Sequence, residues 1–120
     1  MLVDTSVWID HLRASNATLV DLLEHARVWT HAFVVGELAC GHLARRRELL
    51  TSLAALPHVS MVRHEEVLAF IDAHRLMGKG LGWIDMHLLA AATLAKVPLW
   101  TSDKRLSDVA SRLGLQPSLA

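Results

Sequence analysis

Short apolar segments alternate with longer stretches of helical periodicity along this chain. We predict buried strands where a few apolar residues stand together, and helices where apolar residues recur every three or four positions. The predicted strands are residues 2–3, 28–30, 59–62 and 98–101, and residues 115–116 are a candidate edge strand. The predicted helices are one or two turns at 7–12, then 17–26, two helices within 33–56 separated near 41–45, 64–78, 85–96 and 104–114. This alternation is typical of an α/β fold, here a three-layer α/β/α domain with a short, mostly parallel central sheet.

Turn-forming residues mark the boundaries of these elements. Asn16 is predicted to cap the helix that follows it, and Pro57 ends the second long helical stretch. The segment GKGLGW at 78–83 holds three glycines and is predicted to be a loop. No internal repeat, low-complexity tract or linker divides the sequence, so we expect one domain over residues 1–120.

Composition narrows the class of protein. At 120 residues the chain is long enough to bury a core without disulfides, and its 52% hydrophobic content excludes a disordered protein. No apolar run reaches the roughly 18 residues of a membrane span, and no leader-like segment precedes the first strand. Cys40 is the only cysteine. A lone thiol is typical of a reducing compartment, so we expect a cytoplasmic protein with no membrane partner.

Four acidic residues are predicted to meet at one edge of the sheet. Asp4 directly follows the first strand, and Asp103 follows the strand at 98–101 with one residue between them. Glu37 falls in the first turns of the helix after the second strand, and Asp85 begins the helix after the glycine loop. Sites in open α/β sheets lie outside the carboxyl ends of the strands. Helix capping is the alternative for the three aspartates, and an exposed helix face is the alternative for Glu37.

The surroundings of these acids favour a cation site over separate caps. Glu37 lies within VVGELA, among small and apolar residues, where capping has no role. No Arg or Lys lies within one helical turn of Glu37 or Asp85, so local ion pairs are absent. An all-oxygen ligand set suits Mg²⁺ or Mn²⁺. Zinc is disfavoured because the eight histidines are scattered, and we interpret most of them as surface or edge-of-core residues.

The basic residues change this picture only slightly. Net charge is zero, but when the four acids above are set apart from the twelve, twelve Lys and Arg face the remaining eight acids. Basic residues are grouped at 45–47, 63–64 and 104–105. Each group alone is typical of a solvated helix face. Together they permit a phosphate-binding rim around an acidic centre.

Four motifs, each carrying one of the acids, resemble the PIN domain and, in detail, the VapC toxins of bacterial toxin–antitoxin pairs. The motifs are VDTSVWID at 3–10, GELACG at 36–41, GWIDMHLLAAA at 82–92 and LWTSDKRL at 99–106. They occur in order across nearly the whole chain. A single motif of this kind is weakly specific, whereas four in order make a strong resemblance.

The resemblance implies a Mg²⁺- or Mn²⁺-dependent endoribonuclease whose acidic centre is Asp4, Glu37, Asp85 and Asp103. Asp4 and Asp85 would be the principal metal ligands, with Asp103 and Glu37 binding the ion directly or through water. It also implies a homodimer that acts on RNA and is inhibited by a cognate VapB-type antitoxin. The grooves between the helices at 33–56 are the expected contact surface for that antitoxin.

Other residues near the motifs have smaller predicted roles. The resemblance makes Thr101 and Ser6 accessory polar neighbours of the acids. Cys40 is predicted to be a small buried packing residue near Glu37 rather than a nucleophile. The tryptophans are expected in the core, except that Trp83, beside the glycine loop, is a candidate for stacking on a base.

Two other functions stay open on the sequence. One is a PIN-fold RNA-processing nuclease without an antitoxin, which the absence of an appended RNA-binding module counts against. The other is a non-catalytic scaffold that binds a partner through its helices, with the acids acting only as caps. Metal-dependent cleavage of RNA would exclude the scaffold.

Overall fold

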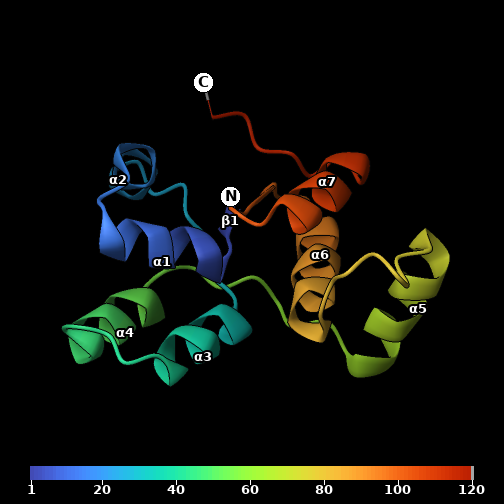
Figure 1. Cartoon of the computed structure of the whole chain (residues 1–120), viewed down its shortest axis with the longest axis horizontal. Helices are drawn as coiled ribbons and strands as arrows, with labels where there is room; N and C mark the ends of the chain where they lie inside the picture. Colours follow the sequence, from blue (N-terminus) through green and yellow to red (C-terminus); the bar gives the residue numbers. More distant parts are fainter. Residues whose placement is uncertain (120) are drawn as a thin grey trace.

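The structure is a computed structural model that describes residues 1–119. These residues form seven helices and two short strands, and six of the helices lie between the two strands in the sequence (Figure 1). In chain order the elements are β1 (Leu2–Val3), α1 (Thr5–Arg13), α2 (Ala17–Glu24), α3 (Ala32–Cys40), α4 (Arg46–Ala54), α5 (His64–His74), α6 (Trp83–Ala95), β2 (Leu99–Trp100) and α7 (Lys104–Arg112). None of the helices in residues 1–119 has the length and hydropathy of a membrane span.

The strand β1 lies at the centre of a small parallel sheet. It pairs with β2, with Leu2 opposite Leu99 and Val3 opposite Trp100. On its other side, Leu2 forms a single parallel bridge with Trp29. The predicted strand at 2–3 is therefore confirmed, the strand predicted at 98–101 is found over Leu99–Trp100 only, and the two lie side by side.

The outer predicted strands are reduced to isolated contacts. Thr30 forms one bridge with His58, and the N–H of Leu99 donates to the carbonyl of Leu115 at 2.9 Å. The predictions of full strands at 28–30 and 59–62, and of an edge strand at 115–116, were wrong in this respect. The chain leaves the sheet soon after each contact, since α3 begins two residues after Thr30 and cannot continue the ladder. The backbone order across the sheet still follows a doubly wound α/β arrangement.

Helices lie on both sides of β1, with α1 to α4 on one side and α5 to α7 on the other (Figure 1). The predicted α/β class with helices on both faces of a small, mostly parallel sheet is thus confirmed. The predicted cap at Asn16 is also confirmed, because its side chain accepts the N–H of Leu19 at 3.0 Å.

Several helix ends differ from the prediction. The helix α1 is longer than the one or two predicted turns, and it begins at Thr5. The helix α5 ends at His74 rather than Gly78, because Arg75 adopts the left-handed conformation with φ 55° and breaks the ladder. The helix α6 begins at Trp83, two residues before the predicted start. Asp85 is therefore inside the first turn of α6 and is not its N-cap.

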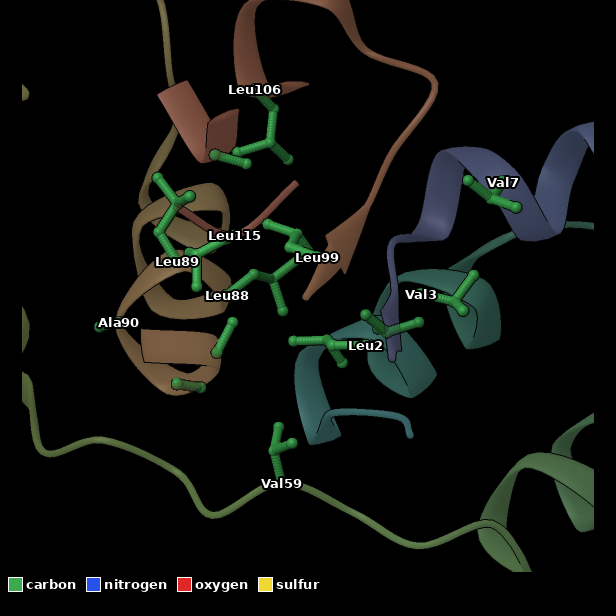
Figure 2. Packing of buried hydrophobic residues seen from close by; sticks show 14 of the residues in the cluster. Leu2, Val3, Val7, Val59, Leu88, Leu89, Ala90, Leu99, Leu106 and Leu115 are labelled. Atoms are coloured by element: carbon green, nitrogen blue, oxygen red, sulfur yellow. The ribbon is translucent and has the colours of Figure 1, made fainter. Parts of the chain in front are cut away.

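The helix α6 is the central element of the core. All of its residues from Met86 to Ala92 are buried. In Figure 2, Leu88 extends from α6 toward Leu99 of the sheet, and both residues belong with Leu2 and Leu89 to one apolar cluster. A helix that is apolar on nearly every side is buried, and it packs against neighbouring elements on all of those sides. This burial fixes the position of the first turn of α6, which carries Asp85, relative to the sheet.

Candidate metal centre

Asp4 stands directly after β1, caps α1 and is 6% exposed. Its Oδ2 accepts hydrogen bonds from the hydroxyls of Ser6 at 2.7 Å and Thr101 at 2.8 Å, and from the N–H of Ser6 at 3.4 Å. Among residues 1–119, no donor reaches Oδ1. One carboxylate oxygen thus holds the local structure, and the other is free to bind a ligand.

Hydroxyl groups fasten the loop after β2 to the start of α1. The Oγ1 of Thr101 lies 3.1 Å from the Oγ of Ser6 and accepts the N–H of Asp103 at 3.0 Å. Ser102 donates its N–H to Ser6 Oγ at 2.9 Å and its hydroxyl to Asp10 at 2.7 Å. The two strand ends are therefore joined by side chains as well as by the ladder, which keeps Asp4 and Asp103 at a fixed separation.

Asp103 and Asp85 approach Asp4 from the starts of two helices. Asp103 caps α7, with its Oδ1 accepting the N–H of Leu106 at 3.0 Å. Asp85 accepts the N–H of Gly82 at 3.0 Å. Burial raises the pKa of Asp85 above its ordinary value of 3.8, the Gly82 hydrogen bond lowers it, and the negative charges of Asp4 and Asp103 raise it further. The three aspartates thus lie within electrostatic range of one another.

Glu37 is exposed on α3 and reaches the same end of α1. The hydroxyl of Thr5 donates to Glu37 Oε1 at 2.7 Å. Because Thr5 directly follows Asp4, this bond ties Glu37 to the backbone that carries the buried aspartate. The structure therefore brings all four predicted acids to the carboxyl-end edge of the sheet, with Glu37 at its margin.

These acids lack a cationic partner. The two salt bridges found among residues 1–119 join His25 to Asp21 and Arg63 to Glu65, and neither touches the acidic edge. No three His, Cys, Asp or Glu side chains in that part of the chain converge tightly enough to enclose an ion by themselves. Mg²⁺ retains several waters and needs only one or two carboxylates together with substrate oxygens. The donor set therefore fits a hydrated Mg²⁺ or Mn²⁺ and does not fit a metal enclosed by protein alone.

Aromatic and imidazole rings from the start of α3 and the first turns of α6 form a cluster. The ring of His87 is 4.7 Å from that of Phe33 and 4.8 Å from that of Trp83, and the ring of His31 is 5.3 Å from Phe33. His31 and His87 are both buried, so the surface or edge-of-core interpretation does not hold for these two. Burial lowers the pKa of both imidazoles, to about 4 for His31. Both are therefore neutral at pH 7.

Two predictions for single side chains, Cys40 and Trp29, differ from the structure, and a third, Trp83, agrees with it. Cys40 is exposed rather than buried, because it lies two positions beyond the buried Leu38 and so faces away from the core. Trp29 is 37% exposed, since it alternates with the buried Val28 in an extended segment. Trp83 is 38% exposed at the first position of α6, in keeping with its separation from the other tryptophans.

Sequence reasoning missed two residues of the site, Thr5 and Ser102. A signal for both is present, because the strand ends read Asp-Thr-Ser at 4–6 and Thr-Ser-Asp at 101–103. A carboxylate next to two hydroxyls at two adjacent strand ends indicates a shared hydrogen-bond network. The sequence alone does not say which hydroxyl binds which acid, since that depends on how the two ends are brought together.

The amino-acid sequence of the chain matches a described protein family and two curated proteins. Residues 1–112 match the family described as PIN domain. Two curated relatives are both named Ribonuclease VapC32, one from Mycobacterium tuberculosis (strain CDC 1551 / Oshkosh) and one from Mycobacterium tuberculosis (strain ATCC 25618 / H37Rv). This chain is 44% identical to each over 116 residues, which cover 96% of this chain and 94% of the relative.

Proposed function

The chain belongs to the PIN domain family, and on that premise we propose that it is a metal-dependent endoribonuclease that acts as the toxin of a toxin–antitoxin pair. Its similarity to a VapC ribonuclease over 96% of its length supports both the reaction and the biological class. The proposed substrate is RNA, and the reaction is hydrolysis of a phosphodiester bond. We further propose that residues 1–120 form one PIN domain, of which 1–112 match the family.

One observation carries the proposal for the site. Asp4, Asp85 and Asp103 lie close enough for their charges to affect one another, and no basic side chain among residues 1–119 forms a salt bridge with them. Carboxylates that repel one another are stabilised by a shared cation. Asp4 and Asp103 are helix caps, and Asp85 lies in the first turn of α6. Helix capping alone gives no reason for these three aspartates to lie close together.

The residues proposed to hold Mg²⁺ or Mn²⁺ are Asp4, Asp85 and Asp103, with Glu37 as the fourth member of the catalytic set. When bound, such an ion polarises water for attack and neutralises charge that develops on the phosphodiester. Asp4 offers Oδ1, while its Oδ2 is occupied by the accessory hydroxyls of Ser6 and Thr101. Both of those hydroxyls donate to Asp4 Oδ2 and so hold this carboxylate in place, while water is the attacking group in the proposed reaction.

In the proposed reaction, the side chains of the protein orient the carboxylates and do not themselves attack the phosphodiester. Thr5 fixes one oxygen of Glu37, which leaves the other oxygen to contact water or substrate. Burial and neighbouring charge raise the pKa of Asp85. The neighbouring negative charges therefore disfavour the ionised form of Asp85, and a bound cation would offset that effect.

Partners and location follow from the proposed class. We propose that a cognate VapB-type antitoxin neutralises the protein, that the protein forms a homodimer, and that it acts in the cytoplasm. A single cysteine, which is exposed, is consistent with a reducing compartment. The helices α3 and α4, which contact each other, form the surface predicted for the antitoxin.

The test of activity uses purified protein freed of any partner. It should cleave single-stranded or loop RNA with Mg²⁺ or Mn²⁺, and excess EDTA should stop the cleavage. Asp85→Asn should be inactive, while Asp72→Asn, a matched change at an exposed acid of α5, should cleave like wild type. Cleavage that persists in excess chelator would contradict the metal mechanism.

The test of the biological class uses growth. Expression of the chain alone should arrest growth, and co-expression with the small protein encoded beside it should restore growth and give a stable complex. Arrest that continues in the presence of excess folded neighbour would argue against the antitoxin pairing while leaving the nuclease reaction standing.

A further inference from the structure

A basic pocket lies between the glycine loop and α7. It has a volume of about 290 Å³ and is lined by Lys79, Arg105, Asp108, Val109 and Arg112. Three of these residues carry a positive charge and one carries a negative charge. None of the three bases forms a salt bridge with a carboxylate in residues 1–119. The pocket therefore keeps a surplus of positive charge that no nearby acid neutralises by direct contact.

The backbone of the loop is shaped to receive one of these side chains. Gly80 has φ +77°, and a Cβ placed on it would lie 2.9 Å from Nη1 and 3.0 Å from Cδ of Arg105. A side chain at position 80 would be strained in the left-handed conformation and would have to displace Arg105. Arg105 therefore lies close against the loop at Gly80, and its exposed side chain lines the pocket.

A second arginine is held at the other side of the pocket. Arg112, at the end of α7, donates from Nη2 to the carbonyl of His74 at 3.4 Å. Arg105 and Arg112 are seven positions apart on one helix, which places them on the same face two turns apart. Two like charges fixed on one face repel each other, and an anion bound between them would relieve that repulsion.

The pocket is carried by the same two segments that carry the acids. The loop that contains Lys79 and Gly80 leads directly to Gly82, whose N–H is bound by Asp85. The helix that contains Arg105 begins at its cap, Asp103. The pocket thus flanks the acidic edge. An acidic centre repels the phosphates of a nucleic acid, so affinity for the strand must come from basic groups beside it.

We propose that the pocket formed by Lys79, Arg105 and Arg112 binds backbone phosphates of the RNA strand on one side of the cleavage site. The inference rests on the proposed function for the identity of the nucleic acid. Arginine suits the role because its planar group donates two parallel hydrogen bonds to a phosphate. The pocket would hold the strand by its backbone, without regard to base sequence.

The experiment measures RNA binding apart from cleavage. A short labelled oligouridylate is titrated with wild type and with the triple variant Lys79→Gln, Arg105→Gln, Arg112→Gln in excess EDTA over a series of salt concentrations. The control is the triple variant Arg13→Gln, Arg27→Gln, Lys96→Gln, which removes the same charge from exposed positions outside the pocket. Thermal melts establish that each protein is folded. If the triple variant of the pocket does not fold, the single variant Arg105→Gln takes its place in the comparison.

The pocket variant should bind the RNA about 10- to 100-fold more weakly than the control. The slope of log affinity against log salt should fall by about 0.7 for each phosphate that the protein no longer neutralises, as for single strands. The single change Arg105→Gln should lower that slope by about 0.7, the value for one phosphate. Equal affinity and equal slope in the pocket and control variants would overturn the inference, as would a wild type that does not bind the oligonucleotide.

Two further outcomes separate this inference from the proposed function. Cleavage by wild type with a KM that the pocket changes leave unaltered would overturn the pocket and leave the nuclease standing. Loss of binding in the pocket variant of a protein that cuts no RNA would leave the pocket standing and overturn the nuclease. Competition by polyglutamate as effective as that by RNA would assign the pocket to an acidic protein segment instead.

Discussion

Asp4 and His31 occupy equivalent places in the fold, yet they have different neighbours. Each directly follows a segment of the sheet, each is buried, and each caps the helix that comes next. Asp4 accepts the N–H of Ser6, and His31 accepts the N–H of Phe33 at 2.9 Å. By position and by capping alone, the two residues are indistinguishable.

They differ in what surrounds the rest of the side chain. Asp4 accepts two hydroxyl donors in addition to its cap and lies within range of two other carboxylates. His31 lies among the rings of Phe33 and His87, and its Nε2 has no hydrogen-bond partner in residues 1–119. The strand end at Asp4 is a polar edge whose carboxylates repel one another, and the strand end at His31 is part of the core. A residue that caps a helix can thus also have a function. The groups that surround the rest of its side chain determine whether it does.

The same substitution at both caps gives the largest expected contrast. Asn caps a helix about as well as Asp, so Asp4→Asn should fold, but it replaces a carboxylate oxygen with an amide. We expect its RNA cleavage to fall by about 10²- to 10³-fold or more, as for removal of a charge-stabilising group. His31→Asn keeps a cap acceptor and should retain cleavage within a few fold when folded. Single-turnover rates at saturating Mg²⁺ make the comparison, and equal losses in both variants would mean that Asp4 is only a cap.

The pH dependence of stability should separate the two strand ends next. Burial, followed by the charges of His87 and His58, lowers the pKa of His31 from 6.5 to about 4. Between pH 6.5 and pH 4, His31 binds a proton in the unfolded chain but not in the folded protein. The free energy of unfolding is therefore highest above pH 6.5 and decreases as the pH falls toward 4. The contribution of His31 is at most about 3 kcal/mol. Denaturant unfolding across this range should show a shallower pH slope for His31→Asn than for wild type, and parallel slopes would contradict the assignment.

The sequence predicts the positions of the acids better than their contacts. Asp4 and Asp103 could be placed because an acid at the end of a parallel strand lies at a known edge. The bond from Thr5 to Glu37 could not be predicted, because it depends on how α1 packs against α3. The burial of His31 was missed for the same reason, since a polar residue after a strand reads as surface until its tertiary neighbours are known.

The reduced sheet shows a related limit. The apolar segments at 28–30 and 59–62 have the composition of strands, and Val28, Val59 and Val62 are indeed buried. Their burial is what the pattern predicts. Whether a buried segment also forms a continuous ladder depends on where the next helix draws the chain away, which a hydrophobic pattern does not determine.

The hydroxyls on Asp4, which have no counterpart at His31, should have a smaller effect. Thr101→Val removes one donor from Oδ2 and leaves the shape of the side chain almost unchanged. A hydrogen bond to a charged group contributes about 1.5–3 kcal/mol, so we expect cleavage to fall by about 10- to 150-fold. Thr101→Ser keeps the hydroxyl and should lose much less. Equal losses in the Val and Ser variants would show that packing, rather than the donor, is what the site requires at this position.

The smallest expected effect tests whether the polar edge is strained without a metal. Burial and the charges of Asp4 and Asp103 raise the pKa of Asp85, so its ionised form is disfavoured in the folded protein. Asp85→Asn removes that charge and keeps an acceptor for the N–H of Gly82. In EDTA the variant should melt at the same temperature as wild type or a few degrees higher. Millimolar Mg²⁺ should raise the melting temperature of wild type by mass action and that of the variant less. If Asp85 only stabilised the first turn of α6, the variant would melt no higher than wild type and Mg²⁺ would act equally on both. Four melts, of two proteins with and without Mg²⁺, therefore distinguish an acid that shares a cation from one that completes a helix.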